Sequence, residues 1–162
     1  MPDHLYTVNM PHQSSVTEEL QTLGALLRTP LDLLHDEVFA ELAQAGFAEV
    51  RVAHGAVFRH IARAGSRVTA LAERARMTKQ SMAELVEYLR KWGHIELVPD
   101  PADGRAKLVK LTARGWKVHD QLVKSSAAFE KKCARSLGEQ RWRVLRELLR
   151  EFAAWSQQRR NQ

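Results

Sequence analysis

Side chains suited to binding nucleic acid are concentrated in one short segment near the middle of the chain. The Gln80 amide can make paired hydrogen bonds to adenine, and Lys79 can bind either guanine or a phosphate. A carboxylate repels phosphates, so Glu84 must accept from cytosine or lie away from the backbone. We expect this segment to contact DNA, with an ordinary solvated surface as the alternative. The residues assigned to the contact are Thr78, Lys79, Gln80, Ser81, Ala83 and Glu84.

The same segment begins a predicted helix with one apolar face. Apolar residues recur at helical spacing after Ser81, which is typical of a helix packed on a core through one side. Thr78 is placed to cap its first turn, and Trp92-Gly93 is placed to end it, because glycine adopts the left-handed conformation at low cost. A helix anchored in this way can present its first turn to the DNA major groove. Its apolar residues are Met82, Leu85, Val86 and Leu89.

A β-hairpin is predicted to follow this helix. Strand-like runs at 95–98 and 109–111 flank the turn-forming sequence Asp100–Arg105. Arg105 is near the tip, where a guanidinium can enter the narrow, electronegative minor groove of DNA. The alternative is a surface ion pair of little energetic consequence.

A shorter helical pattern precedes the Thr78 helix. Between Thr69 and about Ala75 it places Leu71 and Ala72 inward, and Arg76-Met77 forms the turn between the two helices. Helix, turn, helix and basic hairpin together predict a winged helix-turn-helix.

The hairpin carries a signature that resembles the wing of the multiple antibiotic resistance regulator (MarR) family. The signature is Asp100-x-x-Asp103-x-Arg105 followed by Val109-x-Leu111-Thr112-x-x-Gly115. Leu71-Ala72 and Thr78–Ser81 also fit the two-helix segment of that family, and the motif match covers roughly residues 54–116.

The resemblance implies a mainly α fold with a small β-wing, in which N- and C-terminal dimerisation helices flank the winged helix-turn-helix. It further implies that Asp103 holds Arg105 and the wing turn. Ser66–Val68 is the candidate for a strand-like piece that completes a small sheet with the wing.

The net charge of +6 is located in this region. Between Arg63 and Lys117 there are 12 Lys or Arg residues and 6 Asp or Glu residues, so the rest of the chain is neutral. Such a surplus is expected of a segment that neutralises phosphates, although a solvated basic surface would have the same composition. The candidate phosphate contacts are Arg63, Arg67, Arg74, Arg76, Lys107 and Lys110.

Length and composition exclude several classes of protein. A chain of 162 residues can bury one substantial core. No apolar run approaches the ~20 residues that span a membrane. The N-terminus lacks the order of a secretory signal, and a single cysteine excludes an internal disulfide, so we expect a cytoplasmic protein without a membrane partner. The chain has no phosphate-cradling glycine loop, G-x-S-x-G or H-E-x-x-H motif, so no enzyme is predicted.

Apolar helical patterns lie on both sides of the predicted DNA-binding region. One runs from about Ser15 to Gly46, with a kink or break expected at Pro30. Another runs from Thr112 to about Ser136, and a last helix follows Gly138, with fraying expected from residue 156. The DNA-binding region cannot cover these faces, so we expect them to form a homodimer rather than to pack only within one chain.

These patterns divide one continuous globular unit into segments. Residues 1–14 are expected to be a flexible arm, 51–111 the winged helix-turn-helix, and 15–50 with 112–162 the dimerisation region.

Resemblance to the MarR family also implies a small effector. Many members release DNA when a small, often aromatic anion enters a crevice between the dimer helices and the DNA-binding region. Each candidate pocket residue has ordinary core or surface packing as its alternative. The candidates are His35, Phe39, His54, Phe58, Arg59, His60, Trp116 and His119.

No cofactor or metal is predicted. The histidines include no short-range pair on one helical face, so they do not form a recognisable set of metal ligands. Cys133 is expected to be a buried, inert thiol rather than a redox sensor.

The predicted function is therefore sequence-specific binding to double-stranded DNA. The family resemblance implies a transcriptional regulator, most often a repressor, that binds a pseudo-palindromic operator as a homodimer. The alternative is a winged-helix module that binds a protein without contacting DNA.

Overall fold

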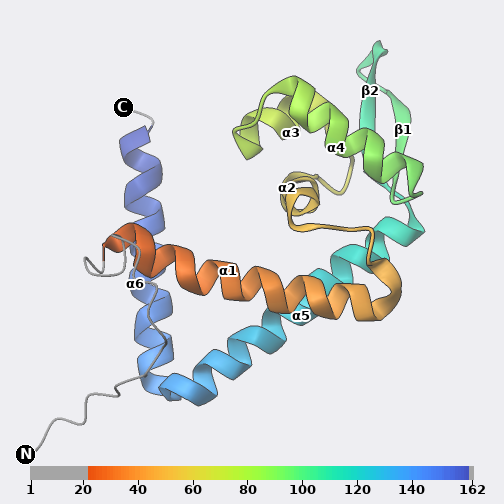
Figure 1. Cartoon of the computed structure of the whole chain (residues 1–162). Coiled ribbons are helices and arrows are strands. Elements are labelled where there is room, and N and C mark those ends of the chain that lie inside the picture. Colours follow the sequence, from red (N-terminus) through yellow and green to blue (C-terminus); the bar gives the residue numbers. More distant parts are fainter. Residues whose placement is uncertain (1–21, 161–162) are drawn as a thin grey trace, which may run out of the picture. The chain divides into compact units, whose positions relative to one another are not determined.

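The computed structural model describes residues 22–160 and is mainly helical with one two-stranded antiparallel hairpin, as predicted (Figure 1). The chain divides after Leu33 into two units, and packing is described below within the second. The predicted flexible arm and the predicted helix start at Ser15 lie outside the described residues. The elements in chain order are α1 (Leu23–Leu42), a π-helical turn (Ala43–Phe47), a 3-10 turn (Val52–His54), α2 (Gly55–His60), α3 (Val68–Ala75), α4 (Lys79–Lys91), β1 (Ile95–Asp100), β2 (Asp103–Leu111), α5 (Ala113–Leu137) and α6 (Glu139–Arg160).

Pro30 does not break the first helix. It lies inside α1, which is continuous from Leu23 to Leu42, so a break, one of the two outcomes expected there, is wrong. Proline removes the hydrogen bond to the carbonyl of Leu26, but that residue is 58% exposed and water can replace the lost donor. The helix ends in the π-helical turn, where Gly46 has a φ of 92°.

The two central helices agree with the prediction from periodicity. In α4 the side chain of Thr78 accepts a hydrogen bond from the Ser81 amide at 3.1 Å, which confirms the predicted cap. Gly93 follows the helix with a φ of 73°, as a stop signal requires. Between α3 and α4, Arg76 takes the left-handed conformation at the turn. Three of the four predicted apolar residues of α4, Met82, Val86 and Leu89, are buried, while Leu85 is half-buried.

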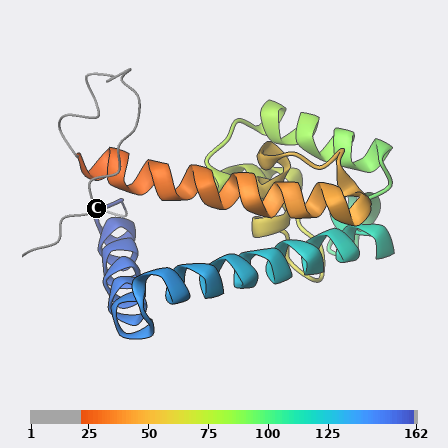
Figure 2. The same ribbon diagram turned by 60° about the horizontal axis from the view of Figure 1, so that its bottom comes forward.

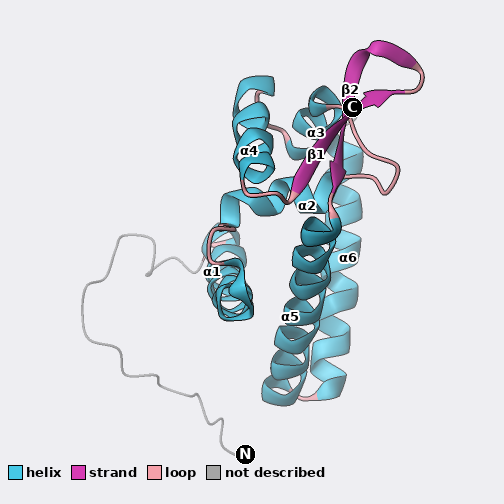
Figure 3. Cartoon of the chain, turned by 90° about the vertical axis from the view of Figure 1, so that its right-hand side faces the viewer, coloured by secondary structure: helices cyan, strands magenta, loops and turns pink. Residues whose placement is uncertain are grey.

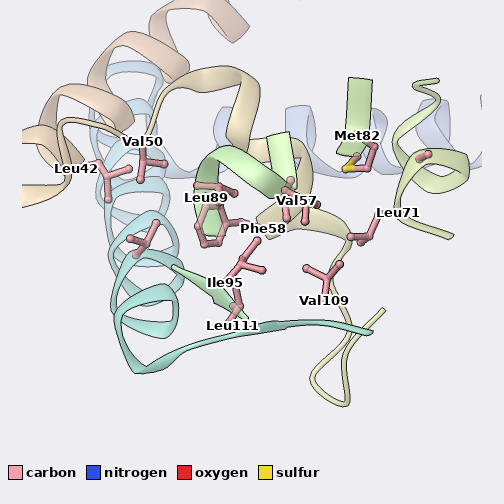
Figure 4. Packing of buried hydrophobic residues seen from close by; sticks show 13 residues of the cluster. Leu42, Val50, Val57, Phe58, Leu71, Met82, Leu89, Ile95, Val109 and Leu111 are labelled. Atoms are coloured by element: carbon pink, nitrogen blue, oxygen red, sulfur yellow. The ribbon is translucent and has the colours of Figure 1, made fainter. Parts of the chain in front are cut away.

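The hairpin is held against these helices by one core (Figure 4). Val57 and Phe58 of α2, Leu71 of α3, Leu89 of α4 and Ile95 of β1 all belong to this cluster. Val52 lies outside this core and is 43% exposed, because the chain forms a separate 3-10 turn there before α2 begins.

One further residue pairs with the two-stranded sheet. Ser66 forms an isolated bridge with Val109, and their backbones exchange hydrogen bonds of 3.0 and 2.8 Å. The strand-like piece expected at Ser66–Val68 is thus confirmed at Ser66, whereas Val68 is already the first residue of α3. The two strands of the hairpin are magenta in Figure 3. Ile95 pairs with Leu111 and Asp100 with Asp103, with an irregularity in register between Pro99 and Asp100.

The two C-terminal helices are long and meet at Gly138, whose φ is 85° (Figure 2). The Thr112 side chain caps α5 by accepting a hydrogen bond from the Gly115 amide at 3.1 Å, as predicted. The fraying expected from residue 156 is wrong for the described part, since α6 continues to Arg160. No residue of α6 is buried, although the helix carries an apolar stripe. The residues of this stripe are Leu145, Leu148, Leu149, Phe152 and Trp155.

Candidate nucleic-acid interface

The first turn of α4 presents polar side chains to solvent. Lys79 and Gln80 are exposed, and Gln80 donates a hydrogen bond from Nε2 to Oε1 of Glu84 at 3.3 Å. The Glu84 carboxylate therefore accepts a hydrogen bond from the Gln80 amide and is not an isolated negative charge. Ala83, the residue before it, is exposed. The Ser81 hydroxyl is engaged locally, because it accepts from Thr78 Oγ1 at 2.9 Å. Lys79 and the carbonyl side of the Gln80 amide are thus available to a ligand.

The wing turn is shaped by two aspartates. Asp100 accepts a hydrogen bond from the Ala102 amide at 2.9 Å, and Asp103 accepts one from the Arg105 amide at 3.2 Å. These bonds fix the backbone at the tip and leave the Arg105 side chain exposed, without a hydrogen bond or ion pair in the described part of the chain. Lys107, further along β2, is also exposed.

Arg67 connects the start of α3 to the wing. We expected it to bind phosphate, but its Nε donates to Oδ2 of Asp100 at 2.7 Å and its Nη2 lies 3.5 Å from Oδ2 of Asp103. The ion pair of Asp103 is therefore with Arg67, while Asp103 holds Arg105 through the backbone alone. The Ala102 amide first, and then the Arg67 guanidinium, lower the pKa of Asp100. In this structure the Arg67 side chain binds both aspartates of the wing turn and so stabilises the wing.

Arg76 lies at the turn between α3 and α4. Its side chain is exposed, while its backbone amide donates to the carbonyl of Glu73 at 3.1 Å. A left-handed conformation is uncommon in a residue other than glycine, and here it closes the turn immediately before the Thr78 cap. Arg76 is therefore fixed close to the first turn of α4.

A buried polar network supports α4 from the opposite end, and it was not foreseen from the sequence. Oε1 of Glu49 accepts from Nε2 of His94 at 2.8 Å and from Nη2 of Arg114 at 2.7 Å. The Tyr88 hydroxyl donates to the Glu49 carbonyl at 3.1 Å. The His54 ring stacks on Tyr88 with centroids 4.5 Å apart. The network joins the segment before α2 to the end of α4 and the start of α5.

Both histidines of this network are held neutral. Burial first, followed by the charge of Arg51, lowers the pKa of His54; burial likewise lowers the pKa of His94 despite the hydrogen bond to Glu49. A neutral His94 donates from Nε2 to the carboxylate, which leaves its buried Nδ1 without a partner in the described structure. Glu49 keeps its charge, because although burial alone would raise its pKa, the hydrogen bond from Arg114 and the other bonds lower it.

Acidification is expected to destabilise the protein through His54 and His94. A histidine whose folded pKa lies below the unfolded value of 6.5 binds fewer protons when folded, so its contribution is present above pH 6.5 and is lost as the pH falls toward the folded pKa. The free energy of unfolding should therefore fall by up to about 1.4 kcal/mol per pH unit for each histidine. Urea unfolding at a series of pH values measures this slope.

The control for this pH dependence is His119→Gln, because the His119 side chain is 35% exposed. That variant should keep the slope of the parent protein. A free energy of unfolding that stays constant from about pH 7.5 to about pH 5.5 would contradict the neutral assignment of both rings.

The predicted effector residues lie in several different surroundings. Phe58 is buried in the core, and Phe39 and Trp116 pack against it. His35 meets the Phe39 ring edge-on at 6.4 Å between centroids, and His119 meets Trp116 at 5.3 Å. Most of these side chains are engaged in packing. Two of the residues predicted from the sequence, Arg59 and His60, line a cavity, whose other walls come from α3 and α6.

Cys133 lies half-buried on α5. Burial first, and then the charge of Glu37, raise the pKa of its thiol, so the protonated form predominates at neutral pH.

Among residues 22–160 no three His, Cys, Asp or Glu side chains are grouped as a metal site would require. In that same range, no helix combines the length and apolar character needed to cross a membrane.

The segment that contains α2, α3, α4 and most of the wing matches the sequence model of a known protein family. The sequence model described as "MarR family" matches residues 40–106, which include α2, α3, α4 and the wing as far as Ala106. No curated protein sequence matches the chain.

Solved structures with the same fold include several transcriptional regulators. The crystal structure of MarR is 22% identical, has a TM-score of 0.75, and the match covers 93% of this chain and 99% of that one. The transcriptional repressor CouR bound to a 23-mer DNA duplex is 18% identical with a TM-score of 0.69, over 88% and 99% of the two chains. The PcaV regulator from Streptomyces coelicolor, in complex with its natural ligand, is 24% identical with a TM-score of 0.63, over 88% and 98%.

Proposed function

The chain belongs to the MarR family of transcriptional regulators, and from that premise we propose that it binds double-stranded DNA through α4 and the wing. The observation that carries the proposal is the pairing of two exposed basic features on one folded unit. The first turn of α4, which Thr78 caps, exposes Lys79 and Gln80. The hairpin, whose turn is held by the hydrogen bond from the Arg105 amide to Asp103, exposes the Arg105 side chain. Figure 1 supports the pairing, because α4 and the hairpin both project from the side of the unit away from α5.

In the proposed complex each feature enters a different groove. The first turn of α4 lies in the major groove, where Lys79 and Gln80 reach base edges. Arg105 enters the adjacent minor groove, while Arg76 and Lys107 contact phosphates. Because Gln80 already donates to Glu84, its orientation is set before DNA arrives.

We propose further that the protein acts as a homodimer on a pseudo-palindromic operator. The stripe on α6 supports this, since Leu148 is 57% and Trp155 is 52% exposed in a single chain. Two subunits would place two α4 helices about one DNA turn, ~34 Å, apart. Occupation of a promoter by such a dimer would repress transcription, and a small-molecule effector would relieve it. CouR, one of the proteins of similar fold, is described as a transcriptional repressor bound to DNA.

Replacement of Arg105 by alanine is expected to weaken DNA binding about tenfold, because one minor-groove contact per subunit is lost. The fold and the dimer should be unchanged, since the exposed Arg105 side chain holds no other described residue in place. A gel-shift titration on DNA selected from a random pool measures the loss.

Arg135→Ala is the control for Arg105→Ala, since it removes the same charge from an exposed position on α5. It should bind the selected DNA like the parent protein. Equal affinities of the two variants would remove the wing from the mechanism.

The alternative is a winged-helix module that binds a protein. A salt titration separates the two functions, because the logarithm of DNA affinity falls by about 0.9 for each phosphate contact per tenfold increase in salt. The proposed complex should therefore show a steep slope, of about −4 or steeper. An interface formed by apolar residues would be almost independent of salt.

A further inference from the structure

An open depression with a volume of about 550 Å³, called the basic cavity below, is lined by residues of α2, the end of α3 and the end of α6. All of its walls belong to the unit formed by residues 34–162. Ala75 is its only apolar lining residue within the part of the chain that the structure describes. Its polar lining residues are Arg59, His60, Arg74, Arg76, Gln157 and Arg160.

The charge of this cavity is of one sign. Among the described residues, four guanidinium groups line it and no carboxylate does. None of the four cavity arginines takes part in an ion pair among residues 22–160, whereas Arg67 is paired with Asp100 and Arg146 with Glu130. Glu73, next to Arg74 in sequence, is not among the lining residues. Like charges held around one space repel each other unless an anion enters.

One of the cavity arginines is fixed in position. Nη1 of Arg74 donates to the carbonyl of His60 at 3.1 Å, which holds its guanidinium against α2 and leaves its other donors free for a ligand. The positive surroundings also affect the His60 ring: burial first, and then the charges of Arg59 and Arg74, lower its pKa. His60 is thus a neutral hydrogen-bonding group at neutral pH, beside the arginines.

We propose that this cavity binds a small polyanion that carries at least one phosphate group. Guanidinium groups bind phosphate oxygens through two parallel hydrogen bonds, and several of them around one space match the charge of a polyanion. The volume lies within the range of small-molecule sites. The nearly complete absence of apolar lining among the described residues disfavours the simple aromatic acid that the family resemblance suggests.

The geometry favours a small molecule over the DNA backbone as the source of the phosphate. Of the exposed groups proposed to meet DNA, Arg76 alone also lines the cavity, and the others are on α4 and the wing. The cavity further includes Arg59 and His60 of α2 and Gln157 and Arg160 of α6. Its opposite walls therefore belong to the DNA-binding region and to a helix outside it. An occupant that contacts both would favour one arrangement of these elements, which would couple its binding to DNA affinity. This coupling rests on the proposed function; binding of the anion does not.

The test is calorimetric titration of the full-length protein with pyrophosphate, at constant ionic strength and without DNA. Arg59→Gln/Arg160→Gln is the informative variant, because both side chains line the cavity, are exposed and form no hydrogen bond or ion pair in the described structure. We expect it to bind pyrophosphate at least tenfold more weakly than the parent. Arg135→Gln/Arg150→Gln removes the same charge from exposed positions outside the cavity and should bind within about twofold of the parent.

Two results would overturn the proposal. One is equal loss of pyrophosphate binding in both double variants, which would show attraction to net charge rather than a site. The other is no pyrophosphate binding by the parent together with weaker DNA binding by the cavity variant alone, which would make these arginines contacts to the DNA backbone. Because the titration contains no DNA, a protein that fails to bind DNA can still bind pyrophosphate, so the two proposals fail separately.

Discussion

Replacing both Leu148 and Phe152 by glutamate is expected to convert the protein to single subunits and to weaken DNA binding by about a hundredfold or more. Both residues lie on the α6 stripe, and their exposed fractions in one chain are 57% and 36%. Burying them against a second copy is favourable, whereas burying four carboxylates in a symmetric interface is strongly unfavourable. A dimer binds its second half-site as an intramolecular event, which typically raises affinity by 10²–10⁴. Sedimentation and gel-shift titration measure the two effects.

Arg150→Glu is the matched control for this variant. It changes the net charge by the same amount, but on a helical wheel it lies opposite the stripe, and it is exposed. It should remain dimeric and lose only the modest affinity that follows from reduced net charge. A Leu148→Glu/Phe152→Glu protein that remains dimeric would show that α6 does not form the subunit interface. Since α6 has no buried residue, both variants should keep a folded winged domain, which circular dichroism can check.

Replacing Gly115 by alanine is expected to lower the free energy of unfolding by about 3 kcal/mol. The β-carbon of an alanine would overlap the carbonyl oxygen of His94 and approach Cβ of Leu111 to 3.2 Å. That carbonyl cannot move freely, because it accepts a hydrogen bond from the Thr112 amide at 3.1 Å. The overlap therefore separates the start of α5 from the end of α4. Denaturant unfolding measures the loss.

Gly104→Ala serves as the comparison, because a β-carbon at Gly104 would meet no atom within 4 Å and the residue does not have a left-handed φ. Its stability should stay within about 0.5 kcal/mol of the parent. The Gly115 account would be contradicted if the two variants unfolded at the same denaturant concentration. This contrast also explains in physical terms why the wing signature ends in glycine.

Features determined by local sequence were predictable. The Thr78 cap, the Gly93 stop and the burial of Met82 follow from interactions within a few residues, and the structure has each of them. The hairpin was equally local, since alternating apolar residues flank a turn-forming segment. The end of α6 was misjudged because its last residues are polar, yet glutamine and arginine are good helix formers and need no buried face.

Features that depend on distant pairs were not predictable. Arg67 is 33 residues from Asp100, and Glu49 is 45 and 65 residues from its two side-chain partners, so no spacing rule connects them. Because the contact between Arg67 and Asp100 cannot be seen in the sequence, Arg67 was predicted to bind phosphate. The basic cavity likewise combines α2, α3 and α6, and its residues are unremarkable in sequence until the fold brings them together.

Binding of DNA by paired subunits, through α4 and the wing, can be tested by selecting bound sequences from a random pool of duplex DNA, with the Leu148→Glu/Phe152→Glu protein in parallel. We expect the parent to enrich an inverted repeat whose half-sites are about 10 base pairs apart from centre to centre, and the variant not to do so. Absence of any enriched sequence, or enrichment of a single unrepeated half-site by the parent, would contradict it.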